Sequence, residues 1–155
     1  MLSHVDATGN PTMVDVSEKK ITRRTAHAQA RVRLSKSILA TLKDNELRTK
    51  KGPVFVTAII AGVQGAKKTA ELIPFCHPLG LDDCKVTILV KGTVVVIDSA
   101  VTVQGRTGVE MEALAAVTIA ALTVYDMCKA LSHEIVIEKI QLISKAGGKK
   151  DFKRR

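Results

Sequence analysis

Two stretches decide the fold of this chain: residues 84–103, CKVTILVKGTVVVIDSAVTV, and residues 107–131, TGVEMEALAAVTIAALTVYDMCKAL. The first contains two runs rich in β-branched residues, 84–90 and 94–103, and a short connection at Gly92 joins them. Apolar β-branched runs with a glycine-containing connection of this length predict a β-hairpin.

The second stretch predicts a helix that runs to about Leu131. Thr107 and Glu110 fit a capping box, in which the Thr107 side chain accepts from the Glu110 backbone and the Glu110 carboxylate reaches back. The helix is rich in Ala and Leu and apolar almost all round, so we expect it to be buried on more than one side.

The flanking segments complete the pattern. Alternating small or apolar and polar residues predict a strand over residues 25–34. Ser35 resembles the N-cap of a short helix over 36–43, and apolar spacing favours a helix over 54–72. Alternation with one change of phase predicts a last strand over 134–144.

The resulting order is strand, helices, strand, strand, helix, strand. This is the split β-α-β arrangement, so we predict an α+β, ferredoxin-like fold: an antiparallel four-stranded sheet covered by helices. The 155 residues suit a single domain over 1–155. We expect a loose N-terminal arm over 1–17 and a basic C-terminal tail over 145–155.

The composition narrows the class of partner. Lys and Arg number 24 against 15 Asp and Glu, a net charge of +9, which suits nucleic acid, an anionic membrane or a phosphorylated small molecule. Aromatic residues are only 3%, too few for a platform that stacks single-stranded nucleic acid. The apolar run at 113–124 is shorter than the roughly 20 residues that span a bilayer, so we expect no membrane segment.

The cysteines indicate a reducing compartment. There are three of them, no Cys-x-x-Cys occurs, and the first ten residues lack the apolar core of a signal peptide. We therefore expect a cytoplasmic protein. Cys76-His77 is not a zinc-ligand spacing, so no metal site is predicted.

The segment LIPFCHPL, residues 72–79, places prolines on both sides of Cys76-His77. Because proline restricts the backbone, this loop presents a thiol and an imidazole rigidly. It is either part of a site or a tight turn with a buried Cys and a capping His.

One face of the long helix carries charge. Glu112, Asp126 and Lys129 share it with Ala115, Ile119 and Leu122. Asp126 and Lys129 form either an ordinary ion pair one turn apart or, because this face is otherwise apolar, a partly desolvated acid–base pair.

Two basic segments suit phosphate. Lys51 precedes Gly52-Pro53, and KAGGKK at 145–150 combines lysines with a Gly-Gly pair that allows close approach of an anion. A Walker-like stretch at 62–68 fails the pattern, because lysine does not follow its last glycine directly.

Taken together, these segments resemble the MoaC family, the cyclic pyranopterin monophosphate synthases of molybdenum cofactor biosynthesis. The resemblance runs from residue 13 to residue 152. Its most specific segments are LIPFCHPL at 72–79, TGVEMEAL at 107–114 and ALTVYDMCKA at 121–130.

The resemblance implies a lyase that converts 3′,8-cyclo-7,8-dihydro-GTP to cyclic pyranopterin monophosphate and releases pyrophosphate, by general acid–base chemistry and without a cofactor. It implies a homohexamer, a trimer of dimers, that binds a small-molecule substrate. Residue by residue, it implies catalytic roles for Asp126, Lys129, Lys51 and His77. It implies substrate contacts from Phe75, Cys76, His77, Met111, Glu112, Lys145, Lys149 and Arg24.

The chain departs from the family pattern at three places. Phe75 stands where Leu is frequent, and His27 stands where Arg is common, which would remove one charge from the site. The segment KAGGKKDF at 145–152 is one residue shorter than the family's and lacks its serines. We therefore do not expect a phosphate contact through those hydroxyls, and Lys150 can take its place.

Spacing adds a prediction about assembly. Glu112 and Asp126 are fourteen residues apart on one helix, about 21 Å along its axis. One small ligand cannot contact both closely, so we predict a composite site across a dimer interface.

Two other classes of function stay open at this point. A small basic nucleic-acid-binding module with a ferredoxin-like sheet would explain the charge, although not Asp126 on an apolar face. An inert scaffold subunit would need none of these residues for activity.

Overall fold

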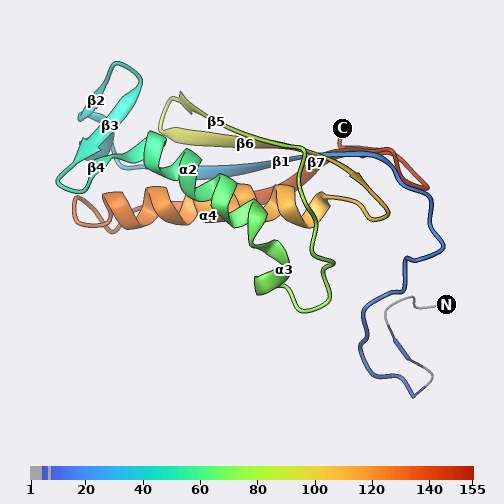
Figure 1. Ribbon diagram of the computed structural model, residues 1–155. Coiled ribbons are helices and arrows are strands. Elements are labelled where there is room, and N and C mark those ends of the chain that lie inside the picture. Colours follow the sequence, from blue (N-terminus) through green and yellow to red (C-terminus); the bar gives the residue numbers. More distant parts are fainter. Residues whose placement is uncertain (1–4, 7) are drawn as a thin grey trace.

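The computed structural model describes residues 5–6 and 8–155; residues 1–4 and 7 of the expected arm lie outside the described residues. Helices α2 and α4 lie side by side on one face of an antiparallel sheet (Figure 1). The sheet order is β5-β6-β1-β7-β8. The strands are β1 Thr22–Arg33, β5 Asp83–Lys91, β6 Val94–Gly105, β7 Val136–Ala146 and β8 Phe152–Lys153.

The α+β class and the antiparallel sheet are therefore confirmed, but the strand number is corrected from four to five. The fifth strand, β8, lies in the expected tail, where its backbone pairs with the edge of β7. The helices are α1 Lys36–Leu39, α2 Val54–Lys67, α3 Thr69–Leu72 and α4 Glu110–Cys128.

A small second sheet, order β2-β3-β4, follows α1. The helix expected over 36–43 is only one turn long, and Leu42–Lys43 instead forms β2, which pairs with β3, Glu46–Thr49. Asp44 and Asn45 connect these strands with φ of 52° and 59°, the left-handed conformation that two-residue hairpin turns require. On its other side β3 pairs with β4, Gly52–Pro53, which ends directly before α2.

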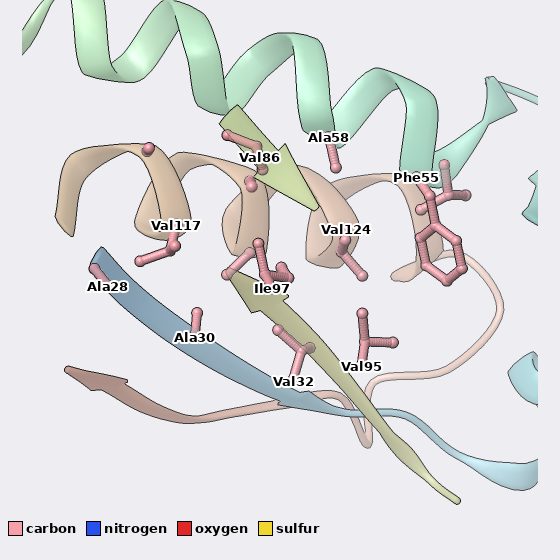
Figure 2. Packing of buried hydrophobic residues seen from close by; sticks show 14 of the residues in the cluster. Ala28, Ala30, Val32, Phe55, Ala58, Val86, Val95, Ile97, Val117 and Val124 are labelled. Carbon is pink, nitrogen blue, oxygen red and sulfur yellow. The ribbon is translucent and has the colours of Figure 1, made fainter. Parts of the chain in front are cut away.

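The core lies between the main sheet and the two long helices (Figure 2). Alternate β1 residues Ala26, Ala28, Ala30 and Val32 face it. Because most of these side chains are small, α4 packs close to the sheet, and its own buried residues are mostly Ala and Val.

The sheet face opposite the helices is polar along β1. His27 Nε2 lies 2.7 Å from Asp98 Oδ1, and Gln29 donates to the same oxygen at 3.0 Å. The His27 side chain therefore pairs with Asp98 on this face, and the loss of a charge from the site at this position stays a prediction.

Helix α4 is long and apolar enough to cross a membrane by length and composition, with a mean hydropathy of 1.5. Half of that window is buried in the protein. Helix α4 packs against α2 on one side and against the sheet on another, which accounts for its apolar composition.

Strand β7 pairs with β1 through two register shifts, so that Glu138 and Ile143 fall between paired positions. Such β-bulges change which face the following residues occupy. The bulge at Glu138 explains the change of phase in the predicted last strand, because it lies between Ile137 and Ile140.

Candidate active site

A cleft of about 640 Å³ opens at the N-terminal end of α4. The residues that line it come from segments distant in sequence: the arm before β1, the start of β1, the loop after α3, the loop before α4 and the end of β7. Eight of the predicted site residues line this cleft: Arg24, Phe75, Cys76, His77, Met111, Glu112, Lys145 and Lys149.

Positive charge dominates the cleft. Six basic side chains line it, against the acidic Glu110 and Glu112; the six are Lys19, Arg24, Arg106, Lys145, Lys149 and Lys150. Arg24 Nε is buried and, within the described part of the chain, has no hydrogen-bond partner. A cluster of this kind with an unpaired buried donor favours an anionic ligand such as a phosphate.

The Gly-Gly pair fits this cluster sterically. Gly147 has a φ of +87°, and a Cβ there would overlap the carbonyl of Arg23. A Cβ on Gly148 would lie 2.7 Å from Arg24 Nη1. Gly147 therefore lets the chain pass close to the Arg23 carbonyl, and Gly148 lets it pass close to the Arg24 guanidinium.

The Glu110 side chain bonds to another cleft residue and does not cap helix α4. Its carboxylate accepts from Lys145 Nζ at 2.7 Å. Val109 occupies the N-cap position without a side-chain hydrogen bond, and Thr107 Oγ1 is buried without a partner among the described groups. The predicted capping box is therefore wrong, because Glu110 pairs across the fold with β7.

Glu112 is the most buried charged group at the site, with 4% of its surface exposed. Burial raises the pKa of this carboxyl above its usual range, and the negative charge of Glu110 adds to the effect. Burial also raises the pKa of the neighbouring Cys76 thiol, and the Glu112 charge raises it further. A carboxyl with a raised pKa is suited to exchange protons near neutral pH.

The Pro-bounded loop places His77 against the arm. His77 Nε2 donates to the carbonyl oxygen of Val14 at 2.8 Å. Of the two interpretations of this loop, the structure favours a site: Phe75, Cys76 and His77 all line the cleft.

Asp126, Lys51 and Lys129 form a second cluster at the other end of α4. Asp126 Oδ2 lies 2.7 Å from Lys51 Nζ, and Asp126 Oδ1 lies 2.9 Å from Lys129 Nζ. The hydrogen bond from Lys129, followed by that from Lys51, lowers the pKa of Asp126 to about 2. Asp126 in turn raises the pKa of Lys129.

This second cluster is open to solvent. Asp126 is 53% exposed and both lysines are 50% exposed. The interpretation of a partly desolvated pair is therefore wrong for the single chain. The face that Asp126 shares with Glu112 changes from buried to exposed along α4.

One chain does not bring the two clusters together. Helix α4 is continuous from Glu110 to Cys128, so Glu112 and Asp126 remain about 21 Å apart along it. Within residues 5–6 and 8–155, no group of three or more His, Cys, Asp or Glu is arranged to hold a metal ion.

Four charged residues of the cleft are not among the predicted site residues: Lys19, Arg106, Glu110 and Lys150. The sequence assigns Glu110 to a cap, and Lys150 belongs to the KAGGKK segment that suits phosphate. Lys19 and Arg106 carry no periodicity or spacing, so nothing in one sequence marks them.

The fold and the cleft define a class: a small α+β protein with a basic cleft, suited to an anionic small molecule, at the end of its core helix. The profile of the MoaC family matches residues 13–148. The chain belongs to this family.

Known proteins are similar in sequence to this chain over almost its whole length. A cyclic pyranopterin monophosphate synthase of Xanthomonas oryzae is 54% identical, covering 97% of this chain and 92% of that protein. The synthase of the same name from Xanthomonas axonopodis is 52% identical over the same shares. Molybdenum cofactor biosynthesis protein 1 of Dictyostelium discoideum is 48% identical over 95% of this chain, which spans only 26% of that longer protein.

Proposed function

We propose that this protein is a cyclic pyranopterin monophosphate synthase of molybdenum cofactor biosynthesis. It converts 3′,8-cyclo-7,8-dihydro-GTP to cyclic pyranopterin monophosphate and releases pyrophosphate. Two synthases that are 52% and 54% identical to this chain over 97% of its length support this function. The observation that carries it structurally is the cleft itself, where six basic side chains surround a buried carboxyl.

The substrate explains the charge of the cleft. A nucleoside triphosphate group carries about four negative charges, and Arg and Lys are the side chains that bind such groups. We assign Arg24, Lys145 and Lys149 to the phosphates. We assign Phe75, Cys76, Met111 and Glu112 to the ring system, because these residues lie around the first turn of α4.

The rearrangement needs proton transfers at the ring and stabilisation of the leaving pyrophosphate. Glu112 supports the first because burial raises its pKa. Asp126 with Lys129 and Lys51 forms the second acid–base group. In this cluster the aspartate is held ionised and the ammonium groups can donate protons or neutralise developing negative charge.

The two clusters are united only if two chains share a site. We propose that the Glu112 end of one chain meets the Asp126 end of a second chain at a dimer interface, within a hexamer that is a trimer of dimers. The separation of about 21 Å on α4 supports this arrangement, because one small ligand cannot contact both ends.

Further features accompany this function. The four long strands, β5-β6-β1-β7, follow the order of a split β-α-β fold, which supports a ferredoxin-like core within a single domain. We propose that the enzyme works without a cofactor. Free thiols at Cys76, Cys84 and Cys128 support a cytoplasmic location.

The nucleic-acid-binding alternative is not favoured. The relatives are named as synthases. Six basic side chains gather in the cleft, whereas on the open face of the sheet His27 pairs with Asp98 and both Arg31 and Arg33 pair with Glu138.

The direct test is pyrophosphate release from 3′,8-cyclo-7,8-dihydro-GTP by the purified protein. We expect turnover by the wild type and its loss in Asp126→Asn and Lys51→Ala. A folded wild-type protein without turnover would refute the synthase function. Full activity in Asp126→Asn would support the scaffold interpretation of that cluster.

A mixing experiment tests the shared site. Glu112→Gln and Asp126→Asn, each inactive alone, are co-expressed with different tags and the mixed oligomer is isolated. In a symmetric dimer one of the two sites of each heterodimer is then wild type at both positions, so activity returns to about half of normal per heterodimer, or about a quarter where the subunits mix at random. No recovery in a verified mixed oligomer would place both residues in one chain's site.

A further inference from the structure

The arm that precedes β1 forms one wall of the cleft. Val14, Val16 and Lys19 line it. Exposure alternates along the arm, with positions 14 and 16 half-buried and positions 13, 15 and 17 exposed. One edge of an extended segment therefore lies against the body of the protein while the other faces solvent.

Local hydrogen bonds give the arm a defined shape. The Asp15 carboxylate accepts from the Ser17 backbone at 2.8 Å, and the Lys19 backbone donates to the Val16 carbonyl at 3.0 Å. Little apolar surface of the arm is buried, so these bonds shape the segment without fixing its place on the cleft.

Two side chains of the body hold the arm by its backbone. His77 Nε2 donates to the Val14 carbonyl at 2.8 Å, and Arg106 Nε donates to the Lys19 carbonyl at 3.1 Å. The two bonds bracket residues 14–19. Arg106 is itself tied to β1, since its carbonyl accepts from Arg24 Nη2 at 3.4 Å.

We propose that His77 and Arg106 are positioning residues that latch residues 14–19 across the cleft and thereby place Lys19 among its basic side chains. This inference rests on the proposed function in taking the ligand to be the phosphorylated substrate. His77 then acts through the arm and is not a proton relay.

The bonding of the imidazole supports this role. A carbonyl oxygen only accepts, so His77 Nε2 keeps its hydrogen in either protonation state while the latch is closed. A relay requires one ring nitrogen to accept a proton while the other gives one up. The bond to Val14 removes one of the two nitrogens from that exchange.

The latch is tested with two substitutions at one position. His77→Gln keeps an N–H donor near the Nε2 position, and His77→Leu removes the donor at similar size. His133→Leu, at an exposed histidine outside the cleft, is the control. Hydrogen exchange of the peptide 13–20 is followed by mass spectrometry, beside KM and kcat for pyrophosphate release.

For His77→Leu we expect faster exchange of this peptide and a KM raised about tenfold, the effect of one lost hydrogen bond, with a much smaller change in kcat. For His77→Gln we expect most of the protection and most of the KM to be restored. A proton relay predicts the opposite, a loss of kcat as large in His77→Gln as in His77→Leu, and that result would overturn the proposal.

A second measurement does not depend on turnover. Pyrophosphate, the proposed product, is titrated into the wild type, Lys19→Ala, His77→Leu and the double variant. If the latch positions Lys19, the double variant binds no more weakly than the weaker single variant. Additive losses would overturn the proposal. If His77→Leu melts early, hydrogen exchange of the peptide 13–20 in Arg106→Leu tests the latch in its place.

The two hypotheses fail differently. If the wild-type protein does not turn over the cyclised nucleotide, the synthase function is refuted. The hydrogen-exchange and pyrophosphate-binding data still test whether His77 and Arg106 hold the arm. Equal exchange of peptide 13–20 in the wild type, His77→Leu and Arg106→Leu removes the latch and leaves the synthase function standing.

Discussion

Lys51 Nζ lies 2.7 Å from Asp126 Oδ2 and 3.1 Å from the Asp126 carbonyl oxygen, although 75 residues separate the two in sequence. Lys51 stands in the turn between β3 and β4, and Asp126 stands in the last turns of α4. The small second sheet therefore positions Lys51 at the C-terminal end of α4.

This geometry predicts the titration of Asp126. Lys129 is the largest cause of its low pKa and Lys51 the next, so removing either ammonium raises the pKa from about 2 towards the ordinary 3.8. We expect a larger rise in Lys129→Met than in Lys51→Met, measured from the Asp126 carboxyl carbon by NMR. Lys50→Met, at the exposed neighbouring lysine, should leave the titration unchanged.

The sign for stability follows from the same shift. A carboxyl with a lowered folded-state pKa stabilises the fold above its unfolded pKa, and this contribution is lost as pH falls through about 2. Because all three side chains are about half exposed, the effect on melting is small near neutral pH. An Asp126 pKa near 3.8 in the wild type would contradict the ion-pair geometry.

A second prediction concerns Glu46, which holds the start of α2. Pro53 precedes the helix and its side chain has no hydrogen-bonding group, but the Glu46 carboxylate accepts from the backbone of Phe55 at 2.7 Å and of Val56 at 3.1 Å. Glu46→Ala should lower the free energy of unfolding by about 1–2 kcal/mol, as loss of a helix cap does. Urea denaturation measures this.

The same substitution loosens the sheet that carries Lys51. We therefore expect Glu46→Ala to reduce kcat below the wild-type value even where the protein is folded. Glu71→Ala, at an exposed glutamate of α3, is the matched control for stability and rate. Unchanged stability in Glu46→Ala would show that solvent caps α2 equally well.

Local patterns predicted the central elements because the core imposes them. Alternation in β1 and the apolar run of α4 reflect burial on the sheet and between layers, and both elements lie where the sequence places them. The long helix over 54–72 was also correct, apart from a break at Lys68 that divides it into α2 and α3.

The errors came from partners distant in sequence. Glu110 satisfies a local capping pattern, yet it pairs with Lys145, 35 residues away. Strand β8 is exposed, and its pairing with the edge of β7 leaves no apolar signature. Lys19 and Arg106 reach the cleft through backbone carbonyl contacts, which no residue pattern encodes.

A third prediction tests the contact between α2 and α4. A Cβ on Gly65 would lie 2.7 Å from Ile119 Cγ1 and 2.9 Å from Ile119 Cβ. Overpacking of a core contact costs about 1–3 kcal/mol, whereas replacing a helical glycine by alanine gains at most about 1 kcal/mol. Gly65→Ala should therefore destabilise the protein in thermal or urea unfolding.

Gly80 provides the comparison, because a Cβ there meets nothing within 4 Å. Gly80→Ala should be neutral or slightly stabilising, since it restricts the unfolded chain. If Gly65→Ala were as stable as Gly80→Ala, α2 and α4 would have to move apart at no cost, contrary to the packing of the core.

The last prediction concerns Glu112. Its folded-state pKa lies above the ordinary 4.5, so the folded protein holds this proton more tightly than the unfolded chain. The free energy of unfolding then declines as pH rises from 4.5 to the folded-state value and is level above it. Glu112→Gln, which is neutral at every pH, removes this loss.

We therefore expect Glu112→Gln to melt at a higher temperature than the wild type at pH 8 and at a similar temperature near pH 4, while pyrophosphate release falls. Glu110→Gln is the contrasting variant: it removes the negative charge that faces Lys145 and should lower the melting temperature at pH 8. A Glu112→Gln variant less stable than the wild type at pH 8 would show that the buried carboxylate stabilises the fold. Higher stability with lower turnover is the signature of a group buried for chemistry at a cost to folding.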